Sequence, residues 1–292
     1  MTQLRSLPGH PDPEHFWVGF ENLQIAGDTW GELGNRLVIL LHGGGQTRHA
    51  WKGVGEQLSN LGYFAVALDA RGHGDSDWSP KGDYGPEASS EDLKAVMRQL
   101  GRSSAILVGA SMGGTTALVA ASEGYVDADG IVLVDVTPVV NLEGVARVRS
   151  FMSQGADGFS SLEEVELAIA NYLPHRTRPR NLDGLAKNVR LDEDGRYRWH
   201  WDPRFIENPW NRAETSERLR HCLSRIAVPT LLVRGRLSDV VSEESVRDYF
   251  KLCPHGRFAE LDNAAHMVAG DRNDLFMSAI TAFLIRELPP IS

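Results

Sequence analysis

Short, uninterrupted runs of apolar residues recur along the chain and alternate with stretches of helical periodicity. Continuous apolar runs are typical of strands buried on both faces of a parallel sheet; here they cover residues 37–41, 64–68, 105–108, 131–134, 230–233 and, more weakly, 257–261. The helix-like segments cover residues 49–60, 91–100, 112–122, 243–252 and 271–287. This alternation predicts a doubly wound α/β fold with a mostly parallel sheet.

Three segments depart from this rhythm. Residues 16–33 alternate apolar and polar side chains, which predicts an antiparallel pair of strands and a sheet of about eight strands in all. Residues 1–14 are polar and rich in proline, and we expect a loosely held arm. Residues 138–225 have no comparable buried run and carry an aromatic cluster. We interpret them as a helical cap inserted after strand 6, with residues 1–137 and 226–292 as the core.

The clearest chemical signal is the pentapeptide GASMG at 109–113. A G-x-S-x-G pattern alone is a weak signal, but this one follows the apolar run 105–108 directly and opens the helix-like segment 112–122. A strand, a sharp turn and a helix are the setting that a nucleophile elbow requires. The sequence therefore predicts Ser111 as a nucleophile.

With this motif the chain resembles the α/β-hydrolase superfamily, over nearly its whole length outside the arm and the insertion. The sequence HGGG at 42–45, followed by Trp51, resembles the family's H-G-x loop. The resemblance implies that the backbone amides of Gly44 and Met112 form an oxyanion hole, which acyl transfer needs to stabilise its transition state. We interpret His42 as a structural brace of this loop.

The resemblance also implies the chain order nucleophile, acid, histidine. Asp239 follows the run 230–233 in a G-x-x-S/D-D turn, and His266 follows the last strand. His266 would deprotonate Ser111 and then protonate the leaving group, while Asp239 would orient the imidazole. Asp135, directly after the run 131–134, is an alternative acid.

The turn DARGHGDS at 69–76 resembles a scaffolding motif of the same family. Epoxide hydrolases and haloalkane dehalogenases share this turn, but they use an aspartate nucleophile, and Ser111 argues against both activities. The resemblance implies a serine hydrolase that cleaves a carboxylic ester or lactone through an acyl-enzyme, of the EC 3.1.1 type. Carbon–carbon hydrolases and cofactor-free perhydrolases share all these motifs and remain alternatives, as does a non-catalytic ligand receptor on the same scaffold.

The aromatic residues of the insertion permit two interpretations. Tyr197, Trp199 and Trp201, with Trp210, either line an apolar substrate pocket or form the small core of the cap. We expect no metal and no cofactor, since the sequence contains neither a metal-ligand spacing nor a phosphate-binding loop.

The net charge and composition of the chain limit the classes of molecule that it is expected to bind. The 292 residues carry a formal net charge of −9, and the pI is about 5.6, so nucleic acid and anionic membranes are not expected partners. No stretch approaches the roughly 18 apolar residues of a membrane span, and Cys222 and Cys253 are expected to be reduced. We expect a cytoplasmic enzyme of a small, ester-like substrate, either a monomer or a homodimer.

Overall fold

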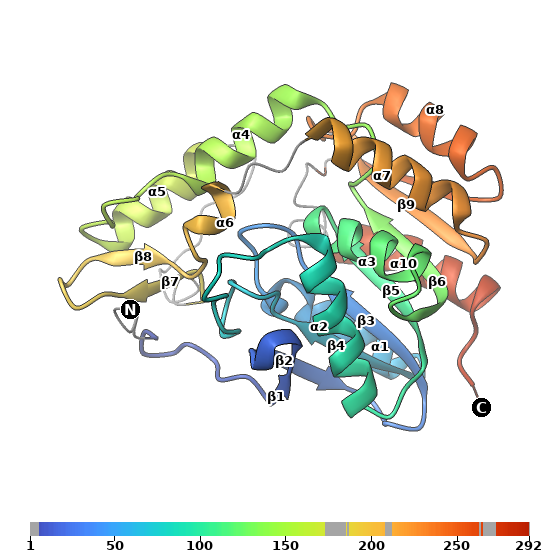
Figure 1. Ribbon diagram of the computed structural model, residues 1–292, viewed down its shortest axis with the longest axis horizontal. Helices are drawn as coiled ribbons and strands as arrows, with labels where there is room; N and C mark the ends of the chain where they lie inside the picture. The colour runs from blue at the N-terminus through green and yellow to red at the C-terminus, as the bar shows by residue number, and fades with distance from the viewer. Residues whose placement is uncertain are drawn as a thin grey trace.

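The computed structural model describes residues 6–172, 185, 187–207, 212–262, 264 and 273–291. Its centre is an eight-stranded sheet in the order β1-β2-β4-β3-β5-β6-β9-β10 (Figure 1). The strands of this sheet are β1 (His15–Val18), β2 (Gln24–Trp30), β3 (Arg36–Leu41), β4 (Tyr63–Leu68), β5 (Ser104–Ala110), β6 (Asp127–Val134), β9 (Thr230–Gly235) and β10 (Arg257–Leu261). The pairings of β1 with β2 and of β2 with β4 are antiparallel, and the other pairings are parallel. The predicted α/β sheet is thereby confirmed.

Helices cover both faces of this sheet. The helices that flank it are α1 (Lys52–Asn60), α2 (Pro86–Gln99), α3 (Met112–Ser122), α7 (Arg212–Arg225), α8 (Glu243–Leu252) and α10 (Asn273–Glu287), with short 3-10 turns η1 (Phe20–Asn22) and η2 (Arg48–Trp51). Apolar residues of α1 and α10 pack on one face of the sheet, and those of α2, α3, α7 and α8 pack on the other.

The alternation of side chains along β3 shows why both faces need cover. Val38 and Leu40 join the core under α1 and α10, whereas Leu37 and Ile39 join the core under α2 and α3. All of these side chains are buried. A strand with such a sequence is stable only between two layers of helices, since burial of each aliphatic side chain contributes about 1.5–3 kcal/mol.

The segment after β6 builds a separate layer, drawn at the upper left of Figure 1. Its elements are α4 (Leu142–Met152), α5 (Leu162–Tyr172), the antiparallel pair β7 (Val189–Leu191) and β8 (Tyr197–Trp199), and α6 (Arg204–Glu207). Helix α7, by contrast, contributes Leu219, Cys222 and Leu223 to the core cluster under α3. The bounds of the cap, residues 138–225, stay a prediction.

The N-terminal arm is held more firmly than its composition suggests. The side chain of His10 is 2% exposed and contacts both carboxylate oxygens of Asp75 at 2.9 Å. The carbonyl of Pro11 accepts a hydrogen bond from Arg48. A buried polar side chain needs hydrogen-bond partners, and the turn that contains Asp75, distant in sequence, supplies them for His10.

Candidate active site

Ser111 lies at a strained turn between β5 and α3. Its backbone has φ 46° and ψ −110°, a conformation that a non-glycine residue adopts rarely and at an energetic cost. The neighbouring glycines allow this turn. A Cβ on Gly109 would lie 2.4 Å from the backbone of Gly113, and a Cβ on Gly113 would lie 2.3 Å from the carbonyl oxygen of Leu41. The pentapeptide thus folds as an elbow that presents its serine above the helix.

The loop after β3 lies beside this serine. A Cβ on Gly43 would lie 3.5 Å from the Cβ of Ser111, and Gly45 has a φ of 73° that favours glycine. Met112 is the first residue of α3, so its amide belongs to the N-terminal turn of the helix, whose N–H groups have no helical acceptor. Helix N-termini stabilise negative charge. Loop and helix end together suit a developing oxyanion.

His42 braces this loop, as its sequence position suggests. One ring nitrogen, Nε2, accepts a hydrogen bond from the Ala70 amide at 2.9 Å, and Nδ1 donates to the Gly43 carbonyl at 2.8 Å. The ring is buried, and its burial lowers the pKa of His42. A neutral ring with both nitrogens occupied is suited to support rather than to proton transfer.

A largely apolar cavity of about 470 Å³ opens above Ser111. Residues from the elbow, the loop after β3, the segment after β6 and helices α4, α6 and α7 line it, among them Gly44, Met112, Val136, Met152 and Phe205. Of the described residues that line it, Arg149 is the single basic one and Asp135 the single acidic one. A cavity of this size accommodates a small substrate with an apolar portion.

The two candidate acids lie in different surroundings. Asp135 follows β6, is fully buried, lines the cavity with Ser111 and accepts a hydrogen bond from the Ser238 hydroxyl at 2.5 Å. Asp239 has a side chain 37% exposed that pairs with Arg147 at 2.7 Å. Asp239 is not among the described residues that line the cavity. The turn 234–239 therefore contributes Ser238 to the site, a residue that the sequence motif contained but did not distinguish.

His266 and Trp210 lie outside the described residues. The chain before His266 is described as far as Asp262 and Ala264, directly after β10.

The other aromatic residues of the insertion form its core. Trp199 and Trp201 are buried, and their rings stack with centroids 4.8 Å apart. Trp199 donates its indole N–H to the Gln154 carbonyl at 2.8 Å, and Tyr197 packs against the same cluster. None of these three is among the described residues that line the cavity. Of the two interpretations that the sequence left open, their packing agrees with the core of the cap.

The turn at 69–76 is a centre of buried charge. Arg48 pairs with Asp69 at 2.6 Å and with Asp75 at 2.7 Å, and Arg190 of the cap pairs with Asp75 at 2.8 Å. Burial acts to raise the pKa of Asp75, but the hydrogen bond from His10 and the charges of Arg190 and Arg48 outweigh it and hold that pKa below its usual range. The turn thus joins arm, core and cap.

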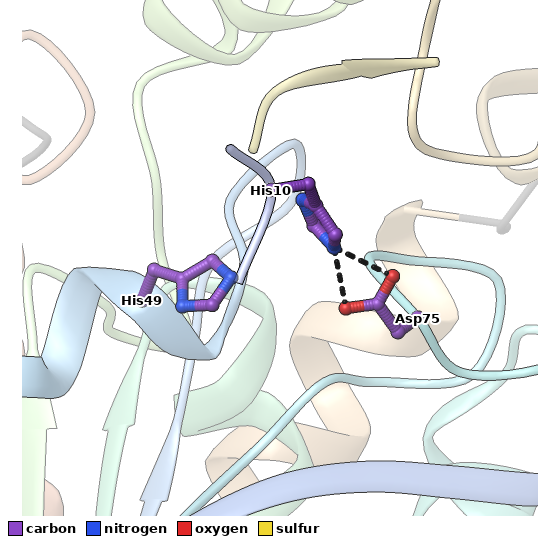
Figure 2. A group of neighbouring side chains, drawn as sticks. All are labelled: His10, His49 and Asp75. Atoms are coloured by element: carbon purple, nitrogen blue, oxygen red, sulfur yellow. Dashed lines mark hydrogen bonds and ion pairs between the residues drawn. The ribbon is translucent and has the colours of Figure 1, made fainter. Parts of the chain in front are cut away.

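His10, His49 and Asp75 come together here, with ligand atoms within 4.8 Å of one another (Figure 2). This grouping could hold a metal ion by distance alone. However, the carboxylate of Asp75 already faces two guanidinium groups, those of Arg48 and Arg190. A divalent cation would meet strong repulsion from them. The donors fit a charge-paired clamp better than a metal site.

Comparison with known proteins agrees with this architecture. A family model described as alpha/beta hydrolase fold matches residues 36–272. The chain is 31% identical over 259 residues to Esterase Rv0045c of Mycobacterium tuberculosis, with 85% of this chain and 82% of that protein covered. A crystal structure of that esterase matches with a TM-score of 0.74 and covers 94% of this chain and 92% of that one.

Two further relatives differ in what their names say they act on. The sn-1-specific diacylglycerol lipase ABHD11 of Mus musculus is 27% identical, with 85% of this chain and 80% of the lipase covered. The 2-(acetamidomethylene)succinate hydrolase of Mesorhizobium japonicum is 27% identical, with coverages of 85% and 87%. A crystal structure of E-2-(acetamidomethylene)succinate hydrolase matches with a TM-score of 0.79 at 24% identity and covers 92% of this chain and 99% of that one.

These relatives support hydrolase activity. Among the described residues, no helix combines the length and apolar composition needed to cross a bilayer. The matched family model covers residues 36–272, a range that includes the elbow at Ser111 and the glycine loop beside it. The chain therefore belongs to the α/β-hydrolase fold family.

Proposed function

We propose that this protein is a serine hydrolase that cleaves a carboxylic ester or lactone through an acyl-enzyme. The observation that carries the proposal is the strained elbow of Ser111 at the floor of an apolar cavity, next to the loop of Gly44. Esterase and lipase relatives support the same bond type.

In the proposed reaction the Ser111 hydroxyl attacks the carbonyl carbon of the substrate while His266 accepts its proton. The amides of Gly44 and Met112 hold the oxyanion of the tetrahedral intermediate. The C–O bond to the alcohol then breaks, and His266 returns its proton to the leaving oxygen. A water molecule, deprotonated by His266, releases the acid and restores Ser111.

For the acid of this triad we propose Asp135 in place of Asp239. A carboxylate that orients an imidazolium acts most strongly when it is shielded from water. Asp135 is fully buried and shares the cavity of Ser111, and the Ser238 hydroxyl donates a hydrogen bond to its carboxyl group. The exposed carboxylate of Asp239 is compensated by Arg147 instead.

The position of Arg149 favours a second candidate function, in which the same serine-dependent hydrolysis acts on a substrate that carries a carboxylate. Arg149 lines the cavity and donates one hydrogen bond to the carbonyl of Ile206 at 2.5 Å. The guanidinium group has further donors in a fixed fork that suits carboxylates. The name of one relative indicates a succinate derivative as its substrate. Carbon–carbon hydrolysis and perhydrolysis would use the same nucleophile.

The test is turnover of short p-nitrophenyl esters by the wild-type protein and by Ser111→Ala. We expect the variant to lose about a thousandfold or more in kcat, and a fluorophosphonate probe to label the wild type only. Equal activity in both proteins would contradict the proposal. A folded wild type that neither turns over esters nor takes the label would favour a ligand receptor. A panel of lactones, acylated carboxylates and meta-cleavage products then ranks the substrate classes.

A further inference from the structure

Among the described residues of the cap, His200 supplies the hydrogen bond to the loop of Gly44. The side chains of Met152, Trp201 and Phe205 lie beside the loop as well. His200 follows β8, and its ring is buried at 1% exposure. Nδ1 accepts a hydrogen bond from the Gly74 amide at 2.8 Å. A nitrogen that accepts from an amide carries no proton, so the neutral ring has its proton on Nε2. Nε2 then donates to the carbonyl of Gly45 at 3.3 Å.

His42 makes the matching arrangement from the core. Its Nε2 accepts from Ala70 and its Nδ1 donates to the Gly43 carbonyl. The two histidines thus hold the carbonyls on either side of Gly44. The Gly43 carbonyl and the Gly44 amide belong to one planar peptide unit, so holding the first orients the second.

Such support is needed because three consecutive glycines form the loop, and glycine restricts its backbone less than any other residue. The loop has one internal backbone hydrogen bond among the described residues, from the Gln46 amide to the Gly43 carbonyl at 3.0 Å. His200 holds the Gly45 carbonyl, which shares a planar peptide unit with the Gln46 amide. That amide donates to the Gly43 carbonyl, so the contact of His200 is transmitted to the peptide unit of the Gly44 amide. Oxyanion stabilisation depends on donors that are oriented before the reaction begins.

The cap can hold His200 in place because its own backbone is fixed. The His200 amide donates to the Asn188 carbonyl at 3.2 Å, and the Asp202 amide donates to the Gly72 carbonyl at 2.9 Å. The ring also lies between two aromatic neighbours, with centroids 5.9 Å from His73 and 5.0 Å from Trp201. Burial and the adjacent His73 lower the pKa of His200 well below its usual value, so the neutral ring persists.

We propose that His200 is a positioning residue through which the cap orients the oxyanion loop. This inference rests on the proposed function, because it assigns a catalytic role to the amide of Gly44. It gives the cap a part in the chemistry itself, in addition to any part in covering the substrate.

Two substitutions separate the contacts of His200. His200→Gln keeps an amide N–H near the position of Nε2 and can still donate to Gly45. His200→Asn reaches only the position of Nδ1 and retains the contact with Gly74. We expect His200→Asn to lower kcat about 10- to 100-fold with little change in KM, and His200→Gln to stay within about threefold of wild type. His221→Gln, at an exposed position on α7, is the matched control.

The outcomes distinguish the two proposals. A wild type without Ser111-dependent turnover contradicts the proposed function and with it a catalytic role for His200. Active wild type with equal kcat in folded His200→Asn, or with equal losses in both variants, overturns the role of His200 alone. If neither variant folds, nitrogen-15 NMR of histidine-labelled wild type decides. We expect a neutral His200 protonated on Nε2 at pH 7, and a proton on Nδ1 would overturn the inference.

Discussion

Ser238 donates a hydrogen bond of 2.5 Å to the carboxylate of Asp135, across a separation of 103 residues in the chain. This contact brings the turn after β9 to the end of β6. The Ser238 hydroxyl also accepts hydrogen bonds from the amides of Val240 and Val241 at 3.1 Å each. The turn that the sequence motif assigned to the catalytic acid thus supports a different carboxylate.

The proposed acid leads to a paired prediction. We expect Asp135→Asn to lower kcat by about 10⁴-fold, since an amide would favour the wrong tautomer of the base. Asp239→Asn should stay within about threefold, because it removes only a surface pair with Arg147. The check is steady-state hydrolysis of a p-nitrophenyl ester by both variants. The reverse order of the two effects would restore Asp239 as the acid.

Arg149 should discriminate among substrates by charge. A hydrogen bond to a charged group contributes about 1.5–3 kcal/mol, so Arg149→Met should weaken kcat/KM for a carboxylate-bearing substrate roughly 10- to 150-fold. Neutral esters should be affected little. Arg147→Met is the matched control, two residues away on α4 with a side chain 62% exposed. Equal losses on charged and neutral substrates would remove the support for carboxylate recognition.

The buried ion pairs of Asp75 with Arg48 and Arg190 predict that loss of the Asp75 charge lowers the stability of the fold strongly. Asp75→Asn would leave Arg48 and Arg190 without one of their counter-charges, and breaking a buried pair costs about 3–5 kcal/mol. The free energy of unfolding in urea measures this cost. The surface pair Lys81 and Glu21 provides a comparison, since the Lys81 side chain is 76% exposed, and Lys81→Met should change stability by less than about 1 kcal/mol. Similar costs at both sites would show that the cluster does not stabilise the fold.

The buried ring of His73 predicts a loss of stability in acid. Burial and the nearby His42 lower the pKa of His73 to about 3, whereas an unfolded histidine titrates near 6.5. The unfolded state therefore binds a proton that the native state does not bind, and stability falls as the pH drops from about 6.5 toward 3, by about 1.4 kcal/mol per pH unit for this group. Replacement of His73 by Phe should flatten the dependence of the unfolding free energy over that range. An unchanged slope would assign the acid lability to other groups.

The sequence alone located most of the strands and helices of the core along the chain. The apolar runs at 37–41 and 105–108 had no stable alternative to burial between two layers, and the structure has them in β3 and β5. The elbow was equally readable, because Gly109 is required by the close approach of the backbone of Gly113, four residues further along the chain. Local patterns suffice where the physical cause is itself local.

The tertiary structure decided what depends on contacts between distant segments. The sequence could not assign Trp199 and Trp201 to the core of the cap, since the same aromatic residues would suit a pocket. Nor could it indicate that His10 is held by Asp75, or that Asp135 and Ser238 meet. Burial and orientation of a polar side chain are set by the partners that the fold brings to it. No periodicity encodes them, and for that reason the surroundings of the acid and the contacts of His200 appear only in three dimensions.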